Sequence, residues 1–198
     1  MTVAVRDRVF ETNSSSSHSV ALGQGDTLEK NFDQESLRSG VINIKCAGNG
    51  HTYYGEERFR YYQPENIVRY LLATIVRGGP DTSDVDTSQS YDAMPLLKAQ
   101  FDGVSDLIDA VEDETKCKVT LMVGAGKRVW LDVDDEADAN FDFSNRESLR
   151  RLLFHESSHI ETKSRNECED DAPEYTDTDM GEEPTDRPGE DRQLGFNL

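Results

Sequence analysis

The chain has 198 residues, of which 35% are hydrophobic, and its 21 Lys and Arg residues face 40 Asp and Glu residues, which gives a formal net charge of −19. This length fits one domain, or one domain with a tail. Such a charge argues against direct binding to nucleic acid, whose phosphates would repel the chain, and against docking on anionic membranes.

No segment has the sequence of a membrane anchor or a secretion signal. The longest apolar run, Leu71–Val76, is far shorter than the roughly 20 residues that a spanning helix needs, and residues 1–11 lack the apolar stretch of a signal peptide. The cysteines are odd in number and show no CxxC spacing: Cys46, Cys117 and Cys168. We therefore expect a protein of the host cytoplasm or of a virion.

The acidity has two sources. The chain holds 22 Asp against 18 Glu and 14 Arg against 7 Lys, a bias typical of proteins from salt-loving archaea and their viruses. Residues 166–198 contain 12 acids and two bases, which gives −10, and residues 1–165 carry the remaining −9. The sequence therefore predicts a body over 1–165 and an acidic low-complexity tail over 166–198.

The first third of the chain predicts short strands. Residues 3–11 alternate between Val and polar positions and predict a strand, the hydroxyl-rich residues 12–19 predict a polar loop, and 20–22 predict the start of a returning strand. A further strand is expected over 41–44, and the aromatic-rich residues 51–62 are expected to be extended.

The middle of the chain predicts helices. Residues 64–76 carry apolar side chains at helical spacing behind Pro64, and Gly78-Gly79-Pro80 ends them. After a polar loop over 81–90, apolar positions between 94 and 111 predict one or two helices, with Gly103 as the candidate break.

The last third of the body mixes both kinds of element. Two strands, 118–123 and 129–133, surround Gly124–Lys127 and predict a hairpin. The S-x-x-E pattern of Ser144–Glu147 predicts a capping box. The helix that it opens would bury Leu149, Leu152 and Leu153. These elements predict an α+β fold with a small mixed or antiparallel sheet and three to four helices, followed by a disordered acidic tail.

The segment HESSH (155–159) matches the zinc-binding pattern H-E-x-x-H. On a helix, His155 and His159 would bind the metal and Glu156 would act as general base. The third ligand is missing from its usual places, and Glu167 is the nearest candidate. A helix through residue 159 would also direct Glu156 into the apolar face of Leu149 and Leu152. The alternative is a helix that ends near His155, followed by a short strand over 157–162.

The run TNSSSSHS (12–19) is the most unusual local sequence. Its hydroxyls and its imidazole could bind phosphate or provide a nucleophile and a base, whereas the alternative is a turn whose side chains satisfy their own backbone. We note these candidates of unknown role: Ser14, Ser15, Ser16, Ser17 and His18.

Residues 10–19 resemble the N-terminal signature of a group of uncharacterised proteins from tailed phages and prokaryotic genomes. Residues 65–75 and 149–162 resemble further segments of that group, so the resemblance extends over most of 8–165. In that group the stretch that matches 155–159 does not keep both histidines, which argues against the zinc interpretation. The resemblance implies no activity, substrate or catalytic residue.

Three weaker patterns have simpler explanations. The Tyr- and Arg-rich residues 53–70 could stack nucleic-acid bases, although core packing is commoner. Gly124–Lys127 lacks the spacing of a phosphate-binding P-loop, and the acidic residues 132–138 lack the Gly and terminal Glu of an EF-hand.

Two functions of different classes follow. The first is a non-enzymatic accessory or virion-associated protein of a halophilic archaeon or its tailed virus, which binds a protein partner and needs no cofactor; its acidic tail could alternatively mimic nucleic acid towards a basic host factor. The second is a zinc-dependent hydrolase that uses the HESSH segment. The apolar end of the tail is a candidate docking peptide, with Leu194, Phe196 and Leu198 as its contacts.

Overall fold

The computed structural model describes residues 16–24, 28–45, 51–54, 59–133, 145–164 and 175–176. Its helices are α1 (Gln34–Ser39), α2 (Pro64–Val76), α3 (Met94–Gln100), α4 (Val104–Thr115) and α5 (Arg146–Phe154). Its strands are β1 (Ser16–Ala21), β2 (Val41–Asn43), β3 (His51–Tyr54), β4 (Phe59–Tyr61), β5 (Tyr91–Asp92), β6 (Lys118–Thr120), β7 (Met122–Val123), β8 (Trp130–Val133), β9 (His159–Ser164) and β10 (Tyr175–Thr176). The fold is α+β, as predicted, but with five helices rather than three or four.

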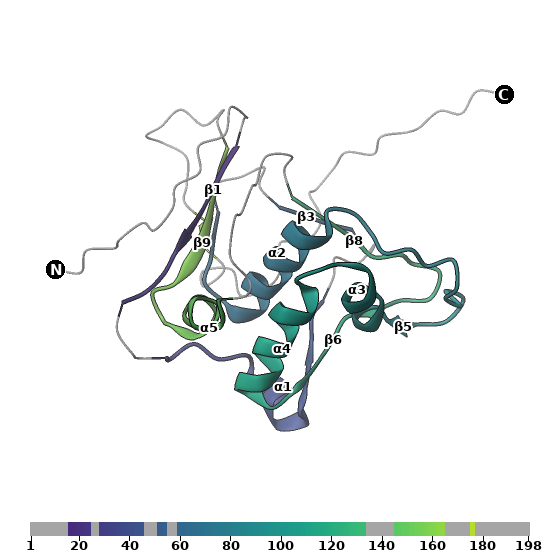
Figure 1. The fold of residues 1–198 in the computed structure, drawn as a ribbon, viewed down its shortest axis with the longest axis horizontal. Helices are drawn as coiled ribbons and strands as arrows, with labels where there is room; N and C mark the ends of the chain where they lie inside the picture. Colours follow the sequence, from purple (N-terminus) through teal and green to yellow (C-terminus); the bar gives the residue numbers. More distant parts are fainter. Residues whose placement is uncertain are drawn as a thin grey trace.

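The strands of the described residues form four small sheets. The largest has the order β1-β9-β4-β10, in which β9 is antiparallel to both β1 and β4, and β10 is parallel to β4. Two parallel pairs, β2 with β6 and β3 with β8, and one antiparallel pair, β5 with β7, complete the set. Figure 1 shows α2, α3 and α4 in front of these smaller sheets, and α5 beside β1 and β9.

Helix α2 is the centre of the hydrophobic core. The helix contacts β3, β8, α4 and α5, which explains why apolar side chains occur on most of its sides. Even Tyr70 has no exposed surface, and burial raises the pKa of its hydroxyl far above the ordinary range. Pro64 occupies the first turn as predicted, and Arg77 at φ 42° ends the helix in the left-handed region.

Four sequence expectations are corrected, two of them in the middle of the chain. Residues 118–123 and 129–133 form strands, but they do not form a hairpin, because β6 pairs with β2, β7 with β5 and β8 with β3. Residues 124–127 still form the expected turn, with Lys127 N donating to Gly124 O over 3.0 Å. The cap of α5 is Asn145, whose side chain accepts from Ser148 N over 3.1 Å, so the cap lies one residue after the predicted one.

The other two corrections concern the ends of the chain. The second half of the hydroxyl-rich run belongs to strand β1 rather than to a loop, while the predicted strand over 3–11 lies outside the described residues. Tyr175–Thr176, inside the predicted disordered tail, pairs with β4, and the rest of 166–198 lies outside the described residues.

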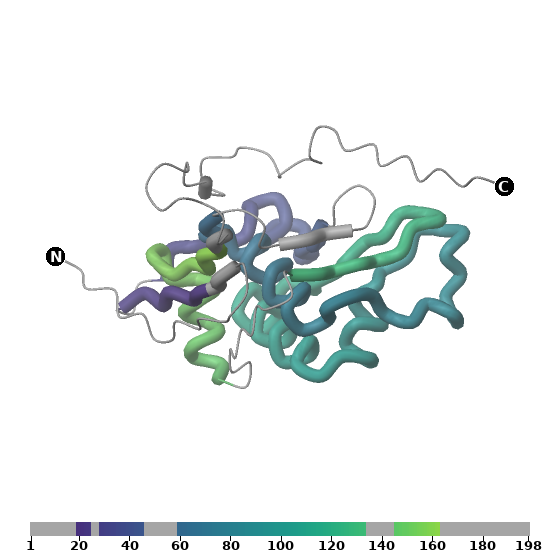
Figure 2. The backbone as a smooth tube through the Cα atoms, turned by 90° about the horizontal axis from the view of Figure 1, so that it is seen from above, coloured from purple at the N-terminus to yellow at the C-terminus, as the bar shows by residue number. Residues whose placement is uncertain are grey.

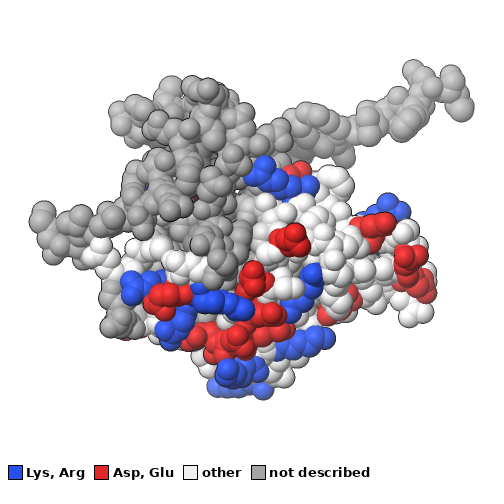
Figure 3. Space-filling model, in the orientation of Figure 1, with Lys and Arg blue, Asp and Glu red and all other residues white. Residues whose placement is uncertain are grey.

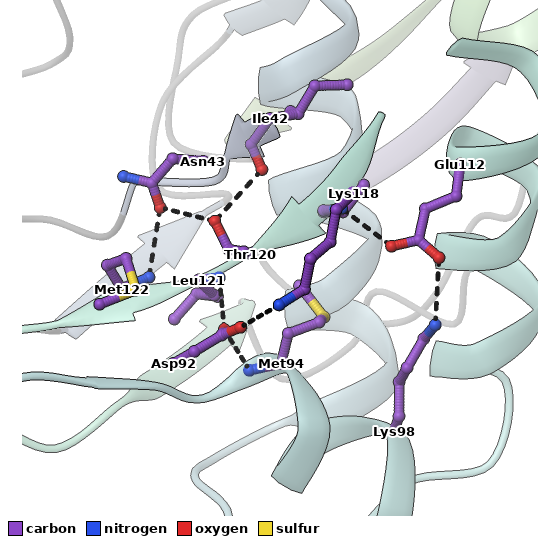
Figure 4. A network of polar contacts seen from close by, with 11 residues as sticks. Ile42, Asn43, Asp92, Met94, Lys98, Glu112, Lys118, Thr120, Leu121 and Met122 are labelled. Carbon is purple, nitrogen blue, oxygen red and sulfur yellow. Dashed lines mark hydrogen bonds and ion pairs between the residues drawn. The ribbon is translucent and has the colours of Figure 1, made fainter. Parts of the chain in front are cut away.

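Side chains complete the hydrogen bonding of the strand that contains β6 and β7 (Figure 4). On the edge turned away from β2, Val119 N donates to Glu112 Oε1 over 2.9 Å and Leu121 N donates to Asp92 Oδ1 over 3.0 Å. On the other edge, where β2 ends, Met122 N donates to Asn43 Oδ1 over 3.3 Å. These acceptors replace a neighbouring strand, because backbone N–H groups that lack a partner are costly when buried.

Candidate functional site

The HESSH segment lies at the junction of α5 and β9 and not on one helix. α5 ends at Phe154, His155 is its C-terminal cap with extended backbone (φ −78°, ψ 130°), and β9 begins at His159. Glu156 is exposed instead of entering the apolar face of α5. The alternative of a helix end near His155 is confirmed, and a strand follows it, over His159–Ser164 rather than 157–162. The helical spacing that the zinc interpretation needs is not formed.

His155 is 4% exposed, and both of its ring nitrogens have protein partners. Nε2 lies 2.9 Å from the carbonyl oxygen of Gln24, so Nε2 carries the proton and donates it. Nδ1 then accepts from Ser157, whose hydroxyl lies at 3.1 Å and whose backbone N lies at 3.3 Å. A metal bound to His155 would have to displace these donors, because Nδ1 holds the only available lone pair of the ring.

Gly23 and Lys30 form hydrogen bonds with the turn that joins α5 to β9. Gly23 N donates to Ser158 Oγ over 2.8 Å, and Lys30 Nζ donates to Ser158 O over 2.6 Å and to Leu152 O over 3.2 Å. Lys30 therefore satisfies a carbonyl in the last turn of α5, where a cation is also favoured by the helix dipole. The contacts join the N-terminal part of the chain to residues more than a hundred positions away.

The β1-β9-β4 sheet brings together the three segments that the sequence singled out. His18 and Ser19 of the signature run pair with Thr162 and Glu161, and Glu161 also pairs with Arg60 of the Tyr- and Arg-rich segment. Ser16 and Ser17 are also residues of β1, whereas Ser14 and Ser15 lie outside the described residues. The signature run therefore provides a strand that pairs with the continuation of the HESSH segment.

One face of this sheet carries polar side chains. Arg60 Nη2 lies 3.5 Å from Glu161 Oε1, and the Glu161 side chain is only 5% exposed. The His159 ring stacks on Tyr62 with ring centroids 4.7 Å apart, and His159 Nδ1 lies 3.1 Å from Ser157 O. Burial lowers the pKa of His159, with further lowering by Arg60 and Lys30, against the opposing effects of the Ser157 carbonyl and Glu161.

The lowered pKa of His159 predicts a pH-dependent stability. Because the unfolded chain binds a proton more readily, the free energy of unfolding falls as the pH drops from about 7.5 through the ordinary His pKa of about 6.5 towards the lower pKa of the folded state. His159→Phe keeps an aromatic ring on Tyr62 and cannot titrate. Urea unfolding of both proteins over this range should show a smaller loss for the variant, and parallel curves would contradict the prediction.

The remaining predicted site residues cannot be placed. Glu167, Leu194, Phe196 and Leu198 lie outside the described residues. Within the described part of the chain, no group of three or more His, Cys, Asp or Glu side chains is arranged to hold a metal ion. The sequence did not single out Gly23 and Lys30 as residues of this site. Their importance follows only from their contacts with residues 152–158 in the folded structure.

A comparison of the chain with protein-family models, curated proteins and solved structures yields no match. Among the described residues, no helix has the length and apolar composition needed to cross a bilayer.

Proposed function

We propose that this protein acts by binding another protein, as a non-enzymatic accessory or virion-associated factor of a halophilic archaeon or its tailed virus. The observation that carries the proposal is Trp130, whose side chain is 47% exposed at the start of β8. Large exposed aromatic side chains are the commonest energetic anchors of protein interfaces.

The backbone around Trp130 is hydrogen-bonded along both edges of β8. β8 pairs with β3 along one edge, and on the other edge Leu131 and Gly78 exchange two hydrogen bonds of 2.7 Å each. The indole Nε1 donates to Asp132 Oδ2 over 3.3 Å, which orients the ring. A partner would therefore meet a preorganised aromatic side chain and lose little entropy in ordering it.

The HESSH segment supports binding rather than hydrolysis. His155 uses both ring nitrogens inside the fold, and Glu156 points to solvent from a turn. The segment thus has a structural explanation, the joining of α5 to β9, that requires no catalytic role.

Composition supports the proposed source. An excess of Asp and Arg with few Lys keeps a surface hydrated in molar salt, where charge repulsion is screened. We expect the free energy of unfolding to rise between about 0.1 M and about 2 M KCl, because salt screens the repulsion within a chain of net charge −19. Equal stability at both concentrations would contradict the halophilic source.

Partner binding is tested with Trp130→Ser. Tagged full-length protein is used to capture partners from infected halophilic cells, and the partner identified by mass spectrometry is purified and titrated against wild type and variant. We expect affinity to fall by more than about tenfold, as for a central interface anchor. Val85→Ser, which removes apolar surface from the loop over 81–90, is the matched control and should bind normally. Equal affinity of wild type and Trp130→Ser would contradict the proposal.

A further inference from the structure

Two segments of the chain, residues 77–92 and 121–131, run side by side as an arm at the right of Figure 2. β5 pairs with β7 within this arm, and near its tip Gly126 N donates to Thr87 O over 2.7 Å. At its base the second segment continues into β8, which pairs with β3. The base of the arm is therefore a hydrogen-bonded strand region and can hold side chains in fixed positions.

Side chains alternate between buried and exposed along this part of the chain. The buried positions are Val129, Leu131 and Val133. Between them, Arg128 and Trp130 are exposed and Asp132 is partly exposed. In an extended backbone such alternate positions lie on one side of the strand, about 6.6 Å apart. We call Arg128, Trp130 and Asp132 the outward row.

Two glycines lie beside the indole of Trp130. A Cβ at Gly79 would lie 3.5 Å from Trp130 Cε3 and 2.5 Å from Val129 O, and a Cβ at Gly78 would lie 4.0 Å from Trp130 Cη2. The contact with Val129 O leaves no room for a side chain at residue 79. Neither glycine places a side chain beside the ring, an arrangement that allows a ligand to approach closely.

The two polar members of the outward row keep hydrogen-bonding capacity. Within the described part of the chain, the Arg128 guanidinium makes no ion pair or hydrogen bond. Asp132 Oδ1 accepts from Val133 N over 3.0 Å and Oδ2 from Trp130 Nε1 over 3.3 Å. An ionised carboxylate accepts about four hydrogen bonds, so each oxygen can accept one more. The row thus offers a donor and an acceptor on opposite sides of an aromatic ring.

Charges of both signs surround the outward row. Lys127 adds a second exposed cation, while the loop over 81–90 carries three exposed carboxylates, Asp81, Asp84 and Asp86. Basic and acidic side chains lie next to one another at the right-hand end of Figure 3. A strongly charged ligand of either sign would therefore be repelled by part of this surface. The surroundings favour a neutral ligand that carries both donors and acceptors.

A pyranose ring has these properties. When its hydroxyls are equatorial, both of its faces consist of C–H groups, whose positive edges pack on the negative face of an indole. The hydroxyls lie on the rim, and each can donate and accept. Over Trp130, some of them can accept from Arg128 and others can donate to Asp132. An apolar side chain in this place would cover both charged groups without offering them a partner.

We propose that the outward row binds a hexopyranose ring of a glycan, stacked on Trp130 and hydrogen-bonded by Arg128 and Asp132. This inference deepens the proposed function, on which it rests, because it makes the partner a glycosylated protein. One ring has few atoms and is contacted from one side, so we expect a dissociation constant of about 1–10 mM. A partner that carries several such rings would bind more tightly through multivalency.

Trp130 is the only tryptophan of the chain, so its fluorescence reports on this site. The full-length protein is titrated with methyl β-D-glucopyranoside, whose ring hydroxyls are all equatorial. We expect a saturable change in emission, together with saturation-transfer NMR signals at the C–H protons of the sugar ring. Glycerol, which has hydroxyls but no ring face, is the matched ligand control and should give neither.

Variants assign the binding to the outward row, with saturation-transfer NMR as the measurement because two of them lack the fluorophore. Trp130→Ser should abolish the transfer, whereas Trp130→Phe keeps an aromatic face and should retain it. Arg128→Ala should weaken binding about fivefold, through the loss of one hydrogen-bond donor. The matched control is Arg38→Ala, which removes an exposed arginine from α1 and should bind as wild type does.

Three outcomes would overturn the inference. The first is the absence of saturable binding up to about 100 mM glucoside, well above the expected dissociation constant. The second is unchanged binding by Trp130→Ser. The third is stronger transfer to adenosine than to the glucoside, which would assign the site to nucleobases.

A measurement on the captured partner separates this inference from the proposed function. Mild periodate oxidation cleaves the vicinal diols of pyranose rings, so the treated partner should lose affinity for this protein. A partner that binds equally well after oxidation, but more weakly to Trp130→Ser, would overturn the glycan and leave the protein-binding function standing. Equal affinity of the untreated partner for wild type and Trp130→Ser would overturn both.

Discussion

Gly23→Ala is expected to lower the free energy of unfolding by about 3 kcal/mol, the upper range for overpacking a rigid core. A Cβ at residue 23 would lie 1.9 Å from Nδ1, 2.3 Å from Cε1 and 2.5 Å from Cγ of the His155 ring. The ring cannot move aside, because its two nitrogens are bonded to Gln24 and Ser157 and its side chain is buried. The new methyl group would therefore have to push the Gly23 backbone away from Ser158.

A second substitution tests whether this clash is the cause. His155→Ala alone should cost about 3 kcal/mol, through the lost ring and its hydrogen bonds. In the double variant the methyl group of residue 23 enters the space that the ring leaves, so the total cost should fall short of the sum by at least about 1 kcal/mol. The four proteins are compared by urea unfolding at one pH. Additive costs would show that Gly23 and His155 do not meet as the structure places them.

Asp92→Ala is expected to cost about 3 kcal/mol, because one carboxylate oxygen accepts two backbone hydrogen bonds. Asp92 Oδ1 lies 3.0 Å from Met94 N at the start of α3 and 3.0 Å from Leu121 N between β6 and β7. Its second oxygen lies 3.7 Å from Lys118 Nζ (Figure 4). Removing the side chain leaves two N–H donors without a partner, each at a cost of about 1–3 kcal/mol.

Two variants separate the hydrogen bonds of Asp92 from its charge. Asp92→Asn keeps an oxygen in the acceptor position, so it should retain most of the stability and lose only the small effect of the ion pair with the exposed Lys118. Asp86→Ala removes a similar Asp contact, to Ser88, from an exposed loop and should cost little. Amide hydrogen exchange should accelerate at Met94 and Leu121 in Asp92→Ala. If Asp92→Asn is as unstable as Asp92→Ala, the hydrogen-bond explanation is wrong.

Local sequence signals were sufficient for the longer helices, whereas the short helix α1 (Gln34–Ser39), which buries no side chain, was not predicted. The apolar spacing of α2 and the Gly103 break between α3 and α4 depend on contacts within one or two turns, which a sequence displays directly. The end of α5 could also be inferred, because a helix through residue 159 would bury Glu156 against leucines.

The pairing of the strands could not be predicted from the sequence. The sequence predicts strands over 118–123 and 129–133, but their proximity along the chain suggests a hairpin that the fold does not form. Their partners lie about eighty residues earlier, in β2 and β3, and short strands of this kind carry no signal for which partner they choose. The β1–β9 pairing likewise joins segments from opposite ends of the body.

The same distinction, between what local sequence determines and what long-range contacts decide, holds for the candidate site. The sequence by itself determined that HESSH, the signature run and the Tyr- and Arg-rich segment were unusual, because composition and spacing are local properties. Only the tertiary structure decided that the three meet on one sheet, that His155 is closed in by Gly23 and Gln24, and that Trp130 is exposed. Each of these facts depends on residues distant in the chain, and side-chain burial and hydrogen-bond partners exist only once those residues have been brought into contact.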